Sequence, residues 1–136
     1  MELIDKILST SIMRLDANLN TITDKDLLGK FRDTFKAMGN YDPMKNESLT
    51  EEMKKEQRAH IWDYSTTFIE QFKARVLNSS ETQLEEFAKL LQQMMMKDTK
   101  EDETYYTRTL QRLYRYTTDL IQFRGMPNKE FKQVYL

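Results

Sequence analysis

The sequence predicts an all-α fold, a single-domain bundle of about five helices with a short C-terminal turn, over residues 1–136. Three observations support this prediction. Only three Gly and two Pro occur among 136 residues, and strong helix formers such as Leu, Lys, Glu, Gln and Met are abundant. Apolar residues recur three and four positions apart in successive stretches. A single chain of this length buries roughly two-thirds of the surface that its unfolded form exposes, enough for a core without disulfides.

The first helix is expected over residues 3–18, where apolar residues keep helical spacing until a run of Asn and Thr interrupts them. Thr23 and Asp26 have the spacing of an N-terminal capping box with a shortened acid, so they open the second helix. Gly39 is placed to end that helix in a left-handed conformation.

Residues 39–49 collect turn formers and make the longest predicted loop, a candidate hinge or partner contact. A long third helix follows, capped either by Ser48 together with Glu51 or by Thr50, and it extends to about Leu77. This helix has the most aromatic face of the chain, and we expect it to be the central packing element.

Ser80 and Gln83 form a capping box for the fourth helix. Its methionine run, residues 94–96, predicts either an adaptable partner-binding surface or a second buried face. The fifth helix is expected over residues 104–124, and a short final turn over residues 128–135 follows a Gly-Met-Pro stop. The predicted core consists of large apolar side chains on four of these helices: Phe31, Phe35, Trp62, Phe68, Phe72, Phe87, Leu91, Leu110 and Leu113.

Composition excludes several classes of protein. The chain has no cysteine, which excludes disulfides, thiolate zinc sites and thiol nucleophiles and agrees with a reducing compartment. Its first residues predict neither a signal peptide nor a transit peptide. No apolar run approaches the roughly 20 residues of a membrane span. A cytoplasmic location with no membrane contact is therefore expected.

No convincing catalytic set is present. His60, the only histidine, lies within helical reach of Glu56 and Asp63, but a di-iron bundle needs Glu-x-x-His pairs on two helices. A solvated surface cluster is the favoured interpretation of these three residues. Phosphate-binding glycine loops and the Gly-x-Ser-x-Gly elbow are both missing. The sequence predicts that the protein is not an enzyme and has no metal and no cofactor.

The late helix carries the one pointer to function. Residues 104–136 contain six Lys or Arg against two acids, an excess of +4, whereas the remainder of the chain carries −5. Three arginines share one helical face and define the arginine row: Arg108, Arg112 and Arg115. Two tyrosines flank the row and three cations extend it: Tyr105, Tyr116, Arg124, Lys129 and Lys132. Interleaved guanidinium and phenol groups are typical of surfaces that hold phosphates and stacked bases.

Two interpretations of the arginine row remain open. In the first, its arginines pair with carboxylates of neighbouring helices or merely solvate the bundle. In the second, they face outward and bind phosphates. Arg108 and Arg115 are separated by about 10 Å along a helix, enough to contact two or three successive phosphates. Such contacts are independent of base sequence and weaken as salt increases.

The segments Tyr105-Tyr106-Thr107-Arg108 and Arg112-Leu113-Tyr114-Arg115-Tyr116 lie in a short, cysteine-free, nearly all-helical chain. In size and helix layout the chain resembles the small helical subunits of multi-subunit (class 1) CRISPR–Cas effector complexes. That resemblance implies a role in antiviral defence as a complex subunit. Its implied partners are other protein subunits, the backbone of RNA or single-stranded DNA, and further copies of itself along the complex. The alternative is a helical protein–protein interaction module, or a virus- or phage-encoded regulator, without nucleic-acid contact.

Overall fold

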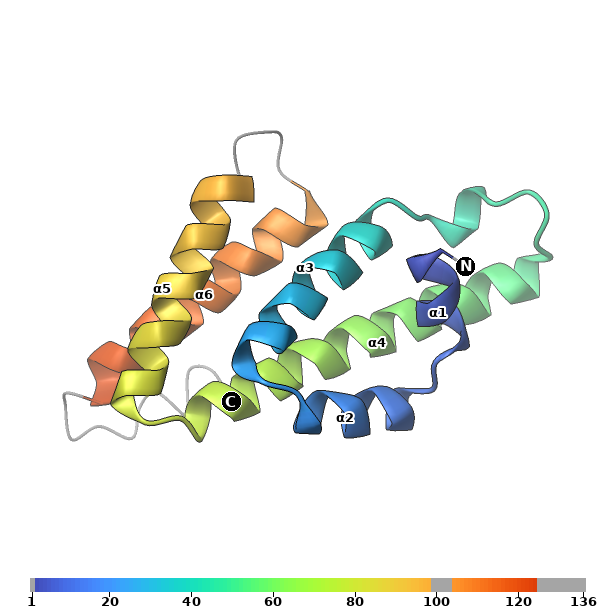
Figure 1. Cartoon of the computed structure of the whole chain (residues 1–136). Helices are drawn as coiled ribbons and strands as arrows, with labels where there is room; N and C mark the ends of the chain where they lie inside the picture. The colour runs from blue at the N-terminus through green and yellow to red at the C-terminus, as the bar shows by residue number, and fades with distance from the viewer. Residues whose placement is uncertain (1, 99–103, 125–136) are drawn as a thin grey trace. The chain divides into compact units, whose positions relative to one another are not determined.

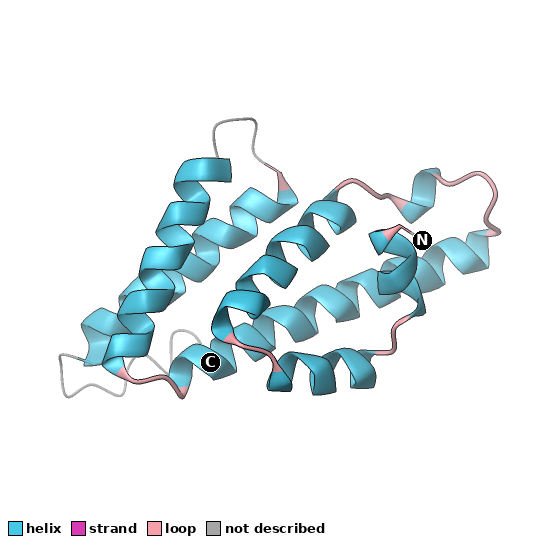
Figure 2. Ribbon diagram, in the orientation of Figure 1, coloured by secondary structure: helices cyan, strands magenta, loops and turns pink. Residues whose placement is uncertain are grey.

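The computed structural model describes residues 2–98 and 104–124, and within them the fold is all-α (Figure 1). The described residues form six α-helices: α1 (Leu3–Ser9), α2 (Ile12–Thr21), α3 (Asp24–Gly39), α4 (Glu51–Leu77), α5 (Glu81–Asp98) and α6 (Tyr105–Arg124). A 3-10 turn, Pro43–Lys45, lies in the connection before α4, and loops join the helices (Figure 2). The predicted all-α class is confirmed, with one helix more than expected. The predicted final turn lies outside the described residues.

The additional helix arises because residues 3–18 do not form one continuous helix. Thr10 and Ser11 both have extended backbone angles, with ψ of 124° and 154°. The Thr10 hydroxyl donates to the Lys6 carbonyl at 2.6 Å, and Ser11 Oγ accepts from the Arg14 amide at 3.1 Å. These short side chains supply the hydrogen bonds of one helix end and one helix start, and so favour a break that apolar periodicity does not register.

Several local predictions are confirmed, and one is wrong. Thr23 Oγ1 accepts from the Asp26 amide at 3.1 Å, and Thr50, not Ser48, caps α4 by accepting from the Met53 amide at 3.2 Å. Gly39 does not end its helix in a left-handed conformation: it is the last residue of α3, and none of the described glycines has a positive φ.

The chain divides into two compact units, Met1–Lys73 and Ala74–Leu136, called here the N-terminal unit and the C-terminal unit. The boundary falls inside α4. The sequence predicted one domain without an internal division.

In the N-terminal unit, α3 lies beside α4 (Figure 1) around three aromatic rings. The ring centroids of Phe31 and Phe35 are 4.5 Å apart, and the edge of one ring meets the face of another between Phe35 and Phe68, at 5.7 Å and 81°. Such edge-to-face pairs add to the stabilisation from burial alone. Side-chain hydrogen bonds hold α2 and the loop after α3 against α4: Gln71 donates to Asp16 of α2, and Tyr41 of the loop donates to Gln57.

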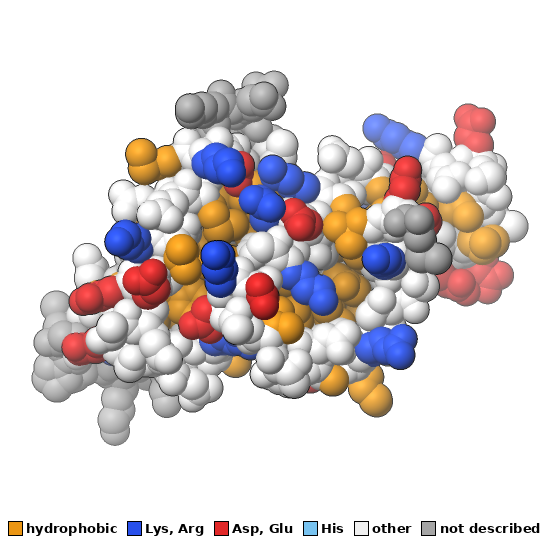
Figure 3. Space-filling model, in the orientation of Figure 1, with side chains coloured by type: hydrophobic (Ala, Val, Ile, Leu, Met, Phe, Trp, Pro, Cys, Tyr) orange, Lys and Arg blue, Asp and Glu red, His pale blue; other side chains and the backbone are white. Residues whose placement is uncertain are grey.

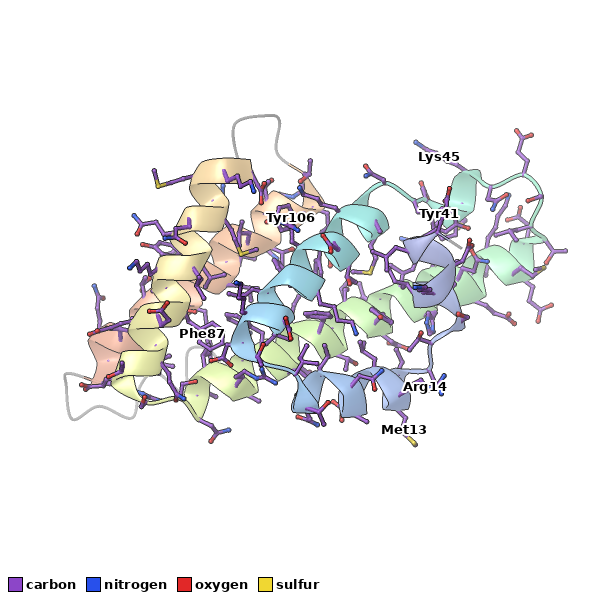
Figure 4. The ribbon with its side chains drawn as sticks, in the orientation of Figure 1. Met13, Arg14, Tyr41, Lys45, Phe87 and Tyr106 are labelled. Atoms are coloured by element: carbon purple, nitrogen blue, oxygen red, sulfur yellow. The ribbon has the colours of Figure 1, made fainter. Side chains whose placement is uncertain are left out.

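In the C-terminal unit, α5 and α6 pack side by side as an antiparallel pair (Figure 1). Leu84, Phe87 and Leu91 are the buried residues of α5, and Phe87 is labelled in Figure 4. Ser80 and Gln83 make the predicted capping box at its start: the Ser80 amide donates to Gln83 Oε1 at 2.8 Å, and the Gln83 amide donates to Ser80 Oγ at 3.2 Å. This pair of helices presents the arginine row.

The predicted core is confirmed with one exception. Eight of its nine residues are at most 2% exposed, but Trp62 is 71% exposed. On α4 Tyr64, which was not in the predicted core, is buried instead. Two helical positions correspond to a rotation of about 200°, so Tyr64 and Trp62 cannot both face the core.

Candidate nucleic-acid interface

Helix α6 begins at a cap made by two threonines. The Thr104 amide donates to Thr107 Oγ1 at 2.8 Å, and the Thr107 amide donates to Thr104 Oγ1 at 3.2 Å. Further along, the buried hydroxyls of Thr109 and Thr117 each donate to the carbonyl four residues earlier at 2.8 Å. The hydroxyls of these two buried threonines are therefore satisfied within the helix itself. The apolar residues of that face, Leu110, Leu113 and Leu120, are 0–4% exposed.

The opposite side of α6 carries the arginine row. Arg108, Arg112 and Arg115 are all exposed, and none of their guanidinium groups forms an ion pair or hydrogen bond within residues 2–98 and 104–124. Asp119 is the only acid of α6 and lies one turn beyond the row. Three positive charges are thus held on one face by a helix whose other face is buried.

The carboxylate of Asp98, close to the start of α6, accepts a hydrogen bond from a tyrosine. The hydroxyl of Tyr106, a residue that is 1% exposed and is labelled in Figure 4, donates to Asp98 Oδ2 at 2.8 Å. This bond joins the end of α5 to the first turn of α6.

On the face shown in Figure 3, Lys and Arg side chains are interspersed with Asp and Glu, so the local +4 excess is a property of the late segment rather than of the whole surface.

The tyrosines predicted beside the arginine row differ in exposure. Tyr105 is half-buried, as is Tyr114. Tyr116 is only 2% exposed, so its predicted role as a surface contact is wrong. It lies on the broad buried side of α6 because the apolar face of this helix spans more than the stripe through Leu110 and Leu113.

Arg124 does not extend the arginine row. Its guanidinium donates to three main-chain carbonyls at the end of α4: Ser79, Leu77 at 2.7 Å, and Val76 at 3.5 Å. These carbonyls belong to the last turn of the helix and the residues after it, where no intrahelical donor is available and a cation is favoured. Arg124 therefore caps a helix, and the prediction that it binds nucleic acid is corrected. Lys129 and Lys132 lie outside the described residues.

His60, predicted to lie in a solvated surface cluster with Glu56 and Asp63, has a structural role. His60 is half-buried, and its Nε2 lies 2.8 Å from the Ile7 carbonyl oxygen. The predicted solvated cluster is therefore wrong for His60, whose ring joins α4 to α1. Within the described part of the chain, no three His, Asp or Glu side chains are grouped so that they could hold a metal ion. No helix there is long and apolar enough to cross a membrane.

Sequence reasoning missed two strongly exposed apolar side chains. Trp62 was expected in the core, and Met13 of α2 is 83% exposed and points away from its helix (Figure 4). Met96 is 69% exposed, whereas Met94 and Met95 are half-buried. The methionine run thus divides between the two alternatives that the sequence left open.

Comparison with known proteins found no protein-family model, curated protein or solved structure that matches this chain.

Proposed function

We propose that the protein is a non-catalytic helical subunit of a ribonucleoprotein complex of the CRISPR effector kind. In this proposal α6 supports RNA or single-stranded DNA through contacts to the backbone. The observation that carries the proposal is the arginine row: Arg108, Arg112 and Arg115 are exposed and form no ion pair with the described residues.

Exposed guanidinium groups on a helix suit phosphate. Arginine presents a planar fork of donors that matches phosphate oxygens, and its charge does not titrate in proteins. Three such groups within about 10 Å neutralise neighbouring phosphates and release their counterions. Residues 104–136 carry +4 whereas the rest of the chain carries −5, so the net charge favours approach of nucleic acid to the late segment.

The segment between Arg108 and Arg115 supports a binding role rather than a chemical one. It contains no histidine and no carboxylate, the groups that most often transfer protons near neutral pH. Phosphate contacts alone position a strand without reading its bases. The remaining surfaces are then available to other protein subunits or to further copies of the chain along the complex.

The test measures how the affinity for a single-stranded oligonucleotide depends on salt concentration. It compares the wild-type protein with the triple variant Arg108→Ala/Arg112→Ala/Arg115→Ala. We expect weaker binding, and a log–log salt dependence that is flatter by about 2, at about 0.7 per lost phosphate contact. The matched control removes three exposed cations of the N-terminal unit, Arg14→Ala/Lys25→Ala/Lys45→Ala, which changes net charge equally. If both triple variants lose the same affinity, the arginine row is not the binding surface.

A protein–protein interaction module without nucleic-acid contact is the second candidate, and the exposure of Met96 favours it. Flexible, polarizable methionines on a surface adapt to irregular partners. This candidate predicts no binding of oligonucleotide by the wild-type protein even at low salt. Retention of nucleic acid at low salt argues against it.

A further inference from the structure

Trp62 is the only tryptophan of the chain, and it is 71% exposed on α4 in the N-terminal unit. Tryptophan carries the largest apolar surface of any side chain and is highly buried on average. The core of this unit is filled without it, by Tyr64, Phe68 and the phenylalanines of α3. An exposed indole on a rigid helix offers a flat ring that the fold itself does not use.

The surroundings of Trp62 on α4 are cationic and polar. Its neighbours one turn away on the helix are the exposed Arg58 and Ala59, the half-buried Thr66 and the buried Ser65. Lys55 lies one turn before Arg58. Both cations are exposed and form no ion pair with the described residues. Glu51, at the start of this face, is paired with Lys54 at 3.2 Å. Asp63 is rotated by about 100° from Trp62.

We propose that Trp62 stacks against an unpaired base of a single-stranded nucleic acid while Arg58 and Lys55 contact its phosphates. This inference rests on the proposed function, because it requires a nucleic-acid ligand, and it adds a contact in the N-terminal unit. The cations lie about 6 Å and 10 Å from Trp62 along the helix axis, on the scale of neighbouring nucleotides in an extended strand. Aromatic platforms with adjacent cations bind single strands without base preference.

The neighbours of Trp62 favour a base over a protein partner. A tryptophan at the centre of a protein interface is normally surrounded by further contacts that exclude water from it. Around Trp62, however, the exposed adjacent positions are a cation and a methyl group, Thr66 is half-buried, and Ser65 is buried. A stacked base requires only one face of the ring and a positive charge within reach of its phosphate.

The single tryptophan makes the test direct, because fluorescence excited beyond the tyrosine absorption comes from Trp62 alone. The full-length protein is titrated with oligothymidylate of about 15 nucleotides, and binding is also followed by anisotropy of a labelled strand. We expect the indole emission to be quenched with the same midpoint as the anisotropy change. Trp62→Ala weakens binding about tenfold, equivalent to about 1.4 kcal/mol, whereas Trp62→Phe retains most of the affinity. Met13→Ala, which removes another exposed apolar side chain, leaves binding unchanged.

Two competitors separate stacking from charge attraction. An abasic strand with the same number of phosphates binds more weakly and does not quench Trp62 if a base stacks there. Poly-glutamate of matched charge is the second competitor and mimics an acidic protein partner. Equal quenching by poly-glutamate or by the abasic strand overturns the inference.

The outcome also distinguishes this inference from the proposed function. If the wild-type protein binds the strand and the triple arginine variant loses affinity while Trp62 emission stays constant, the function stands and the stacking site is wrong. If quenching occurs and Trp62→Ala weakens binding, but the triple arginine variant binds normally, the stacking site stands and the α6 interface is wrong. If the wild-type protein binds no strand, both are wrong.

Discussion

The imidazole Nε2 of His60 lies 2.8 Å from the main-chain oxygen of Ile7, 53 residues earlier in the chain. A carbonyl oxygen only accepts hydrogen bonds, so Nε2 carries the proton and donates it. The acceptor belongs to α1, a helix of seven residues, and helices this short are held by tertiary contacts rather than by their own propensity. The single histidine therefore has a structural task in this fold.

We predict that His60→Ala lowers the free energy of unfolding by about 1 kcal/mol, the typical value for loss of one hydrogen bond. The matched control is Glu56→Gln, one turn earlier on α4 at an exposed position, which should change stability by less than about 0.5 kcal/mol. Urea denaturation gives both values, and amide exchange should accelerate most in α1. Unchanged exchange in α1 would show that the His60 bond does not hold this helix.

Arg124 is predicted to stabilise the C-terminal unit through its bonds to the carbonyls at the end of α4. Arg124→Met keeps most of the aliphatic stem and removes the guanidinium, and it should cost about 1–2 kcal/mol of stability. Arg112→Met, on the exposed row, should cost less than about 0.5 kcal/mol. Thermal or urea denaturation compares the two variants. A larger loss for Arg112→Met would reverse the structural assignment of these two residues.

Ser80 is predicted to initiate α5 by accepting from the Gln83 amide. Ser80→Ala should reduce stability by about 1 kcal/mol, the usual cost of removing a serine cap. Thr82→Ala serves as the control because Thr82 is exposed in the first turn and makes none of the capping bonds. Equal stability of the two variants in urea denaturation would indicate that the capping box contributes nothing.

Ser80 and Arg124 illustrate what sequence reasoning reaches. The capping box was predictable because both partners lie within four residues and the bonds are set by local geometry. The hydrogen bonds of Arg124 to three carbonyls were not predictable, because nothing in the spacing of α6 specifies that its last turn meets the end of α4. Arg108, Arg112 and Arg124 look alike in sequence, and only the tertiary arrangement separates an exposed cation from a helix cap.

Trp62 shows a second limit. Periodicity predicted that α4 carries the most aromatic face of the chain and is its central packing element, and Phe68 and Phe72 are buried as predicted. Aromatic and apolar side chains, however, occur on more than one side of this 27-residue helix. When several faces are apolar, the period alone does not choose which one meets the core. The choice depends on α3, whose phenylalanines contact Phe68.

Tyr64 is predicted to make stability depend on alkaline pH. Burial raises the pKa of its phenol above the ordinary value of 10.0, because the phenolate loses hydration. The unfolded chain then ionises first, so this contribution is fully present below about pH 10 and is lost as pH rises through the folded-state pKa. Tyr64→Phe should flatten the decline of unfolding free energy above about pH 10. Parallel pH profiles for the two proteins would contradict this prediction.

The last prediction compares two aromatic residues six positions apart on α4. Phe68 is 0% exposed and packs against two phenylalanines of α3, so Phe68→Ala removes buried surface and leaves a cavity, at a cost of about 3–5 kcal/mol. Trp62 is 71% exposed, so Trp62→Ala loses little burial and should change stability by less than about 1 kcal/mol. Urea denaturation measures both, followed by far-UV circular dichroism because Trp62→Ala lacks the fluorophore. If Trp62→Ala is as destabilising as Phe68→Ala, the indole is part of the core and cannot be free to stack on a base.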